Sequence, residues 1–350
     1  MTTNPFDMAT FVGRFQPFHN GHLSVIEQAL AQAKHVTVLV GSANKPRDIR
    51  DPFTFEERKE MILGAVSDPN RVHLYQLPDI LYNDAQWVVN VQETVKQAMT
   101  DSFGAWWPLA RIALIGHGKD NSSFYLKLFP QWDAIDVQNH AGMNATDIRA
   151  AYFTRAGYEP KALVPFADRL PASTIKLMEE FAKTPEYENI VGEYEFVQNY
   201  KKSWEAAPYA PTFVTVDACI VQSGHVLLVQ RKARPGKGLW ALPGGFIAQD
   251  ERIEDAVLRE LREETKIKVP TPVLKGNIVT SKVFDHPFRS SRGRTITHAF
   301  LIHLPGDTSL PKVKGADDAD KAKWVPLSEV TADMMYEDHY SIIQNLTAEI

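Results

Sequence analysis

The stretch Gly13-Arg14-Phe15-Gln16-Pro17-Phe18-His19-Asn20-Gly21-His22 decides how the first part of the chain folds. An apolar run at residues 9–12 precedes it and an amphipathic run follows it, which predicts a strand, a turn and a helix. The start of a helix offers unpaired backbone N–H groups and a partial positive charge, both of which favour a bound phosphate. Gly21 leaves room for a ligand beside the backbone, and His19 and His22 lie one helical turn apart. We interpret the stretch as a binding site for the phosphates of a nucleotide.

The composition describes a globular chain that is long enough for two domains. Its 350 residues are 44% hydrophobic and 23% charged, with a net charge of −5, so we expect neither nucleic acid nor a membrane as a partner. No apolar run approaches membrane-spanning length, and the N-terminus lacks the pattern of a signal peptide. The single cysteine, Cys219, lies in an apolar run, which predicts a buried thiol in a reducing, cytoplasmic setting. The sequence leaves the oligomeric state open, a homo-oligomer included.

Residues 9–116 alternate strand-like and helix-like runs. The predicted strands are residues 11–12, 36–40, 72–75 and 112–115, and the predicted helices are residues 23–33, 54–66 and 87–99. This alternation predicts a doubly wound, Rossmann-like parallel sheet of the α/β class. Ligands of such sheets bind at the carboxyl ends of the strands. The opening stretch and the loops that start at Gly41 and Gly116 lie at that edge.

The pattern changes in the second half of the chain. Residues 144–182 look helical, and a charged, aromatic segment follows them. Strands are predicted at residues 213–221, 225–230, 276–284, 295–303 and 324–325, with one helix at residues 252–265. Strands with few helices indicate an α+β domain. We therefore predict domains at residues 1–183 and 208–350, joined by a helical connector at residues 184–207.

Three arginines lie on loops that the predicted sheet brings to the edge where the opening stretch lies. They are Arg14, Arg50 and Arg149. Guanidinium groups match phosphate oxygens, so together these arginines could clamp a triphosphate. An isolated arginine is a solvated surface residue in roughly 80% of cases, and a lone histidine pair is more often structural. The position of the pair after a first strand, with Gly21 between its members, favours binding.

Residues 13–22 resemble the HxGH motif of the nucleotidyltransferase superfamily. Within them, the sequence GRFQPF at residues 13–18 is similar to that of the archaeal type of nicotinamide mononucleotide (NMN) adenylyltransferases. Residues 49–58 resemble a second segment of that family. Asp79-Ile80, Asn83 and Trp87 resemble its nicotinamide pocket, where the tryptophan would stack on the pyridinium ring. Residues 144–149 stand where the family has ISSTxxR and match it at Thr146 and Arg149.

The resemblance implies adenylyl transfer from ATP to NMN, which yields NAD and pyrophosphate. Both substrates are anions, so the enzyme would mainly position them and neutralise charge, and Mg²⁺ would bridge the ATP phosphates. The catalytic residues implied are His19, His22, Arg14, Arg50 and Arg149. The substrate-binding residues implied are Gly13, Phe15, Gly21, Asn83, Trp87, Gly116, Asp120 and Thr146. Two alternatives stay open, namely a different mononucleotide or phosphorylated acceptor and a core role for Trp87.

A second motif begins at Gly245 and runs to residue 267. Its helix carries an apolar stripe and three glutamates near one another, Glu260, Glu263 and Glu264. Like charges at that spacing repel unless a cation binds, and carboxylates suit Mg²⁺ or Mn²⁺. Arg259 could orient these carboxylates. A helix with this composition standing alone is as often a solvated acidic face.

The spacing resembles the Nudix box, GX5EX7REUXEEXGU, at every fixed position except Lys266, where the family has glycine. The resemblance implies an α/β/α sandwich, a metal held by Gly245, Glu260, Glu263 and Glu264, and catalytic roles for Glu263 and Glu264. A metal-bound water would hydrolyse a nucleoside diphosphate derivative. Position 266 follows the helix, where glycine readily takes a left-handed cap. Lysine there costs on the order of 1 kcal/mol, so we expect Lys266 to affect stability and not catalysis.

Residues 315–327 and 336–340 resemble late segments of ADP-ribose pyrophosphatases, which release AMP and ribose 5-phosphate from ADP-ribose. The general base is open between a box glutamate and Glu337. Phe288, Arg289 and Arg294 are candidate substrate contacts or parts of a surface loop. The two domains in this order resemble the bifunctional NMN adenylyltransferase/Nudix hydrolases of bacteria. Two alternatives for the second domain stay open: it could sense ADP-ribose without cleaving it, or cleave another dinucleotide.

Overall fold

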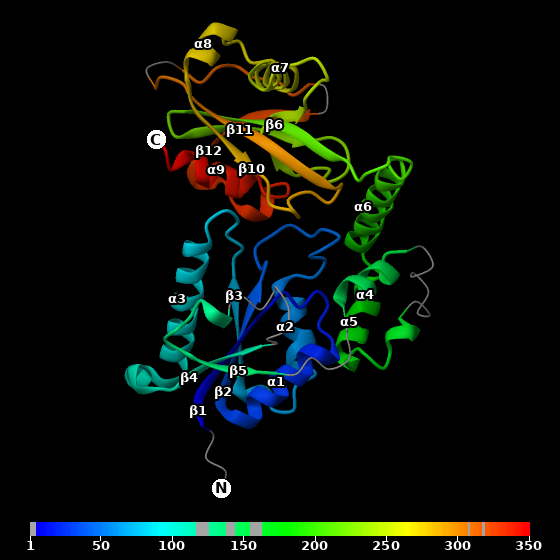
Figure 1. Cartoon of the computed structure of the whole chain (residues 1–350), viewed down its shortest axis with the longest axis vertical. Helices are drawn as coiled ribbons and strands as arrows, with labels where there is room; N and C mark the ends of the chain where they lie inside the picture. The colour runs from blue at the N-terminus through cyan, green and yellow to red at the C-terminus, as the bar shows by residue number, and fades with distance from the viewer. Residues whose placement is uncertain (1–4, 117–125, 138–143, 155–162, 307–308, 317–318) are drawn as a thin grey trace. The chain divides into compact units, whose positions relative to one another are not determined.

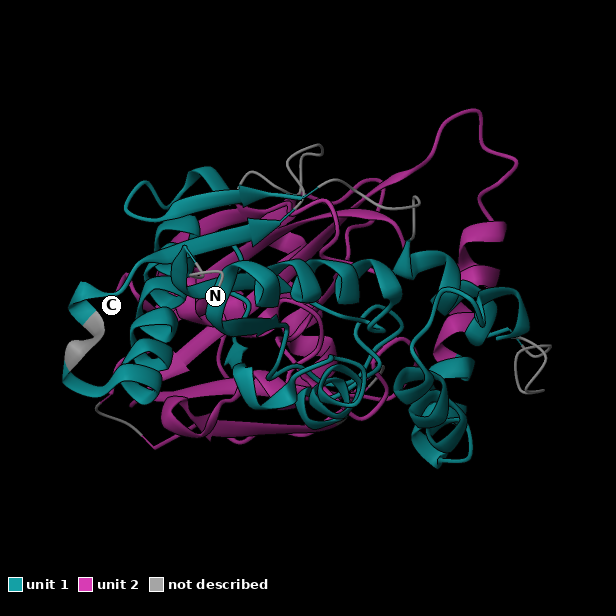
Figure 2. Ribbon diagram, turned by 90° about the horizontal axis from the view of Figure 1, so that it is seen from below, with its two compact units in different colours: residues 1–192 teal, residues 193–350 magenta. Residues whose placement is uncertain are grey.

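The computed structural model describes residues 5–116, 126–137, 144–154, 163–306, 309–316 and 319–350. The chain forms two compact units, Met1–Gly192 and Glu193–Ile350 (Figure 2). Among the helices of the described residues, none combines the length and the apolar character needed to cross a bilayer.

The first unit is built on a parallel sheet with the strand order β3-β2-β1-β4-β5. The strands are β1 (Phe6–Gly13), β2 (Ala33–Gly41), β3 (Val72–Leu77), β4 (Ile112–Gly116) and β5 (Asp133–Asp136). This order, in which β1 is central, confirms the predicted doubly wound α/β fold. The strand β5 was not predicted, because Ile135 is its one buried residue and four residues give no readable alternation.

Helices cover both faces of this sheet (Figure 1). They are α1 (Asn20–Gln32), α2 (Phe55–Leu63) and α3 (Asp84–Phe103), whereas α4 (Ala145–Tyr152) and α5 (Ala172–Phe181) lie to one side of the sheet, with α5 against α2. The apolar stripe of α3, which includes Val91 and Val95, packs on Met8, Leu39 and Leu114 of three strands. The helix α1 follows β1 after a short turn, so its N-terminus lies at the carboxyl edge of the sheet.

The segment predicted as a connector is mostly occupied by the helix α6 (Pro185–Lys202). Tyr187 near its start is buried, and its hydroxyl donates to the Tyr152 carbonyl at 2.5 Å in the first unit. Glu193, further along, accepts a hydrogen bond from the Gly236 amide at 3.1 Å and pairs with Arg234 in the second unit. The helix thus supplies buried side chains to the core of one unit and to a loop of the other.

The second unit contains a seven-stranded mixed sheet with the order β10-β11-β6-β7-β12, on which β8 pairs with β7 and β9 with β6. The strands are β6 (Thr212–Gln222), β7 (His225–Arg231), β8 (Trp240–Ala241), β9 (Gly244–Phe246), β10 (Ile278–Phe284), β11 (Arg294–His303) and β12 (Ala319–Pro326). The predicted hairpin is present, with positive φ at Ser223 and Gly224.

Helices lie on both sides of the second sheet, which confirms the predicted sandwich (Figure 1). They are α7 (Ile253–Thr265) and α8 (Thr271–Gly276) on one side and α9 (His339–Thr347) on the other. Val257 and Leu261 of α7 are buried against Val216 and Ile220 of β6 and Phe300 of β11. The same helix turns Glu260 and Glu264 toward Gly244 and Gly245 of β9.

Candidate active sites

The two histidines of the opening stretch hold the first turn of α1 together. The residue before the helix, His19, has an extended backbone, and its Nδ1 accepts a hydrogen bond from the His22 amide at 3.4 Å. The His19 amide in turn donates to Nδ1 of His22 at 3.4 Å. The two rings stack with their centroids 3.6 Å apart, and Phe15 packs edge-on against His22. Both imidazoles are therefore fixed at a helix N-terminus, where an anion is favoured.

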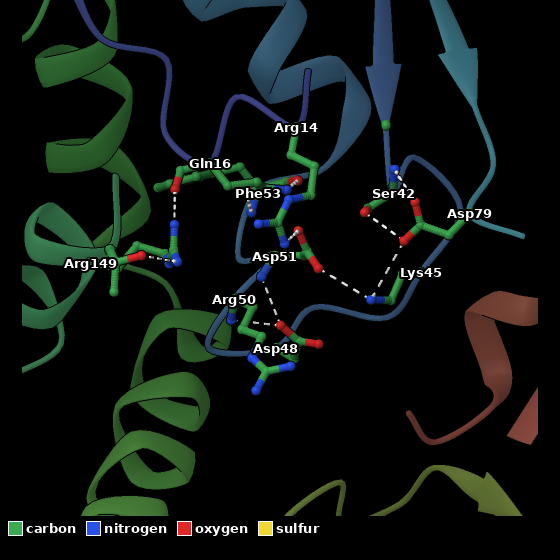
Figure 3. Close-up of polar contacts among 12 residues, drawn as sticks. Arg14, Gln16, Ser42, Lys45, Asp48, Arg50, Asp51, Phe53, Asp79 and Arg149 are labelled. Carbon is green, nitrogen blue, oxygen red and sulfur yellow. Dashed lines mark hydrogen bonds and ion pairs between the residues drawn. The ribbon is translucent and has the colours of Figure 1, made fainter. Parts of the chain in front are cut away.

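The three predicted arginines lie in the same region of the first unit, on the loops around Gln16 and Asp51 (Figure 3). Arg14 Nη1 lies 3.8 Å from Asp51 Oδ1, and Arg50 donates its backbone N–H to Asp48. Arg149 donates to the Gln16 carbonyl at 2.5 Å and so reaches the opening stretch. Burial, followed by the charge of Arg14, lowers the pKa of Arg149. Repulsion among these cations favours binding of a polyanion.

Two buried side chains lock the loops that carry the arginines. The Gln16 amide bonds the Phe53 backbone twice, at 2.9 Å and 3.0 Å, which joins the opening stretch to the loop before α2. Arg58 is fully buried and donates to the carbonyls of Arg14 and Gly41. No role was predicted for Arg58 itself. The sequence feature that could have revealed a buried role is the position of this cation on the same helix face as the apolar Met61 and Ile62.

Of the residues predicted to bind nicotinamide, Asn83 and Trp87 both have structural contacts. Asn83 caps α3 by accepting from the Gln86 amide at 3.0 Å. Trp87 is partly buried at the margin of the core, with its ring centroid 6.2 Å from that of Phe129. Asp79, in the same predicted pocket, accepts from both the amide and the hydroxyl of Ser42. These contacts fix the segment that carries Asp79, Asn83 and Trp87.

The remaining predicted residues of the first site are placed as follows. A Cβ at Gly13 would lie 2.7 Å from the Phe15 ring, so the close approach of that ring requires glycine. Gly21 is buried in the first turn of α1. Thr146 accepts from Arg149 at 3.3 Å. Gly116 ends β4, and Asp120 lies outside the described residues.

In the second unit, Arg259 joins the acidic residues of α7. Its guanidinium donates to both carboxylate oxygens of Glu251 at 2.8 Å. It also donates to Glu260 at 2.8 Å and to Glu263 at 2.9 Å. Two of the three sequence-predicted glutamates, Glu260 and Glu263, therefore share one cation.

Two box glutamates are in a strongly desolvated setting. Glu264 is 8% exposed, and its carboxylate accepts from the Gly244 amide at 3.0 Å. Burial, followed by the charge of Glu260, raises the pKa of Glu264 to about 8. Burial also raises the pKa of Glu260. A Cβ at Gly245 would lie 2.7 Å from the Glu260 carboxylate, so only glycine fits this approach.

The donor set fits a hard divalent cation, because carboxylate oxygens are the ligands that Mg²⁺ and Mn²⁺ prefer. Among the described residues, no three acidic, histidine or cysteine groups are already spaced to hold a metal. Arg259 Nη1 stands between Glu260 and Glu263. A metal at this position would compete with that guanidinium and would stabilise the charged forms of Glu260 and Glu264, which burial and then neighbouring carboxylates disfavour.

The loop between β10 and β11 holds the other predicted contacts of the second unit. Phe288 is 69% exposed, and Arg294 pairs with Asp285 at 3.3 Å. Arg289 differs from both, because it is buried and makes two 2.9 Å bonds to the Asp338 carboxylate. Arg289 is thus an anchor of the loop. Glu337 accepts from a backbone amide of the same loop at 3.0 Å.

Comparison with known proteins assigns a family to each half of the chain. Residues 10–102 match the cytidylyltransferase-like family, and residues 211–346 match the NUDIX domain family. The nicotinamide/nicotinic acid mononucleotide adenylyltransferase of Acinetobacter baylyi is 38% identical over 192 residues, which cover 54% of this chain and 94% of that protein. The ADP-ribose pyrophosphatase of Methanocaldococcus jannaschii is 34% identical over 137 residues, which cover 39% of this chain and 74% of that protein.

Solved structures of one relative match nearly the whole chain. This relative is the bifunctional NMN adenylyltransferase/ADP-ribose pyrophosphatase of Francisella tularensis, crystallised with AMP and a manganese ion. It is 39% identical, with a TM-score of 0.86, and the match covers 98% of this chain and 99% of that one. Fold, sites and similarity together define a nucleotidyltransferase joined to a Nudix hydrolase. Within that class, the chain belongs to the bifunctional NMN adenylyltransferase/ADP-ribose pyrophosphatase family.

Proposed function

We propose that the first unit transfers the adenylyl group of ATP to NMN, giving NAD and pyrophosphate, and that the second hydrolyses ADP-ribose to AMP and ribose 5-phosphate. The observation that carries the first activity is the position of Arg14, Arg50 and Arg149 in the same region of the first unit, together with the His19–His22 turn. The observation that carries the second is the group of carboxylates on α7 around Arg259.

In the first reaction the NMN phosphate attacks the α-phosphorus of ATP and pyrophosphate leaves. Both substrates are anionic, so the barrier falls when cations hold them in line and neutralise the charge that builds up on the leaving group. The arginines would bind the triphosphate, and the imidazoles at the helix start would contact the reacting phosphates. Trp87, stacked on the pyridinium ring, would select the acceptor.

In the second reaction water cleaves the pyrophosphate bridge of ADP-ribose. The metal, when bound, activates that water and neutralises the diphosphate. Glu260, Glu263 and Glu264 would hold the metal, assisted by the backbone at Gly245. Arg259 would orient Glu260 and Glu263 through its hydrogen bonds to their carboxylates, without contacting the metal. We favour Mg²⁺ at both sites and Mn²⁺ as an alternative in the Nudix site, which the manganese ion in the Francisella relative supports.

A substrate panel tests both activities on the purified full-length chain with Mg²⁺ or Mn²⁺. We expect NAD from NMN plus ATP, and AMP from ADP-ribose at a higher kcat/KM than from NADH or other dinucleotides. Nicotinic acid mononucleotide, flavin mononucleotide and phosphopantetheine serve as competing acceptors. Failure to form NAD would refute the first assignment. Binding of ADP-ribose without cleavage would refute the second in favour of a sensor.

A further inference from the structure

Lys45 pairs with two carboxylates of the first unit, and the proposed adenylyl transfer gives this lysine no role. It sits on the loop after β2, and its ammonium is 3.2 Å from Asp51 Oδ2 and 3.8 Å from Asp79 Oδ2 (Figure 3). Its side chain is 25% exposed. Burial alone would lower the pKa of Lys45, but the charges of Asp51, Asp48 and Asp79 raise it well above its ordinary value. The lysine is therefore a charged, partly buried partner of two carboxylates.

Asp51 is the more deeply buried of these two carboxylates. Its side chain is 3% exposed, and Oδ1 has no hydrogen-bond donor among the described residues. Arg14 Nη1 lies 3.8 Å from that oxygen, beyond hydrogen-bond distance, and the Arg14 side chain is 59% exposed. Burial alone would raise the pKa of Asp51, but Lys45 and then Arg14 hold it below its ordinary value. Lys45, Arg14 and Arg58 thus stabilise one buried carboxylate, and Arg14 is also a candidate ligand of the triphosphate.

Removal of Lys45 would change how strongly Asp51 competes with the triphosphate for Arg14. A buried carboxylate that loses its partner is strongly unfavourable, and Arg14 is already beside the oxygen that lacks a donor. Arg14 would then close on Asp51 and form charge-assisted hydrogen bonds with it. A guanidinium held in such a pair is less available to phosphate oxygens.

We propose that Lys45 is a positioning residue for adenylyl transfer, which compensates Asp51 so that Arg14 stays available to the triphosphate. This inference rests on the function proposed above for the first unit. In this proposal Lys45 acts through Asp51 and Arg14 and does not itself contact ATP. The two modes of action are separable, because only an indirect action disappears when Asp51 loses its charge.

The test is a double-mutant cycle of Lys45→Met and Asp51→Asn, read as KM for ATP and for NMN in full-length protein. Lys45→Met alone should raise the KM for ATP about tenfold and change the KM for NMN less than about twofold. In the Asp51→Asn background, the same substitution should change the KM for ATP by less than about threefold. Lys34→Met is the matched control, since Lys34 forms a 2.7 Å pair with Asp7 at the opposite end of β2.

A chemical rescue separates a lost charge from a misfolded loop. In Lys45→Cys, alkylation with 2-bromoethylamine rebuilds an ammonium at nearly the same distance from the backbone. The native Cys219 is fully buried, and burial raises the pKa of its thiol to about 12, so it should not react. We expect alkylation to restore the KM for ATP to within about threefold of wild type.

Three results would overturn the proposal. They are an unchanged KM for ATP in Lys45→Met, effects of the two substitutions that multiply in the double mutant, and a rise confined to the KM for NMN, which would indicate an action through Asp79. A wild-type chain that forms no NAD would refute the proposed function itself. The two failures are therefore distinguishable.

Discussion

Lys266 ends α7 in the left-handed region, with φ of 48° and ψ of 30°. This is the conformation predicted for the box position where the family has glycine. A side chain there costs about 1 kcal/mol, partly offset because glycine makes the unfolded chain more flexible. Lys266→Gly should therefore raise the midpoint of thermal unfolding of the second unit and change the turnover of ADP-ribose less than about twofold.

The matched control for this substitution is Lys268→Gly. Lys268 is equally exposed and lies two residues further on, but its φ is not positive. Glycine there should bring no gain in stability. Unchanged melting of Lys266→Gly together with a large increase in turnover would contradict this account of residue 266.

Trp87 is the residue that we propose selects the acceptor of the first reaction. It is partly buried beside Phe129 at the margin of the core. In the proposed function, the pyridinium ring of NMN stacks on the exposed face of the indole. Trp87→Ala should raise the KM for NMN more than about tenfold, since aromatic stacking on a cation is lost, and leave the KM for ATP within about twofold. Steady-state kinetics with each substrate varied in turn measures both constants.

The control for the loss of packing is Trp87→Phe, which keeps an aromatic face in the same place. It should retain most of the affinity for NMN. Equal increases in both KM values for Trp87→Ala would show that the tryptophan acts only through the stability of α3.

At the scale of elements, β2 and β3 meet through a histidine pair. His35 Nδ1 and His73 Nε2 are 3.1 Å apart, so at least one ring must stay unprotonated. Burial, together with the neighbouring ring for His35, lowers the pKa of both histidines below the ordinary value of 6.5. The unfolded chain then binds more protons than the folded chain, so stability is lost as the pH falls through about 6.5.

Thermal unfolding measured between pH 8 and pH 5.5 checks this expectation. The melting temperature of the wild type should fall more steeply on acidification than that of His73→Gln, whose amide can still accept a hydrogen bond. His225→Gln is the control, because it lies on a hairpin of the second unit. Parallel pH profiles for wild type and His73→Gln would contradict the role of the pair.

Elements with a local signal were predictable from the sequence, and those without one were not. The alternation around β1 and α1 and the apolar stripe of α7 are encoded within a few residues, because each element buries one face. The short strand β5 has a single buried residue. The pairing of Lys45 with Asp51 has no local signal either, since it depends on how the loop after β2 folds back. The same holds for Arg289, a candidate substrate contact that is buried against Asp338.

At the scale of the whole molecule, each proposed activity uses residues of one unit only. The histidines and arginines belong to Met1–Gly192, and the box glutamates belong to Glu193–Ile350. The helix α6 contributes Tyr187 to the first unit and Glu193 to the second. One substitution in each unit should therefore silence one reaction and spare the other.

Glu264→Gln keeps the shape of the side chain but removes a charge that the metal site needs. We expect kcat for ADP-ribose to fall by at least about a hundredfold, with NAD synthesis within about twofold of wild type. His19→Ala should produce the reverse pattern, but it also removes the cap of α1, which costs about 1 kcal/mol. His19→Asn restores a cap and still lacks the imidazole. NAD synthesis that is lost in both His19 variants, with normal cleavage of ADP-ribose, assigns the loss to the ring and not to the helix. Recovery of synthesis in His19→Asn would instead make the histidine a structural cap.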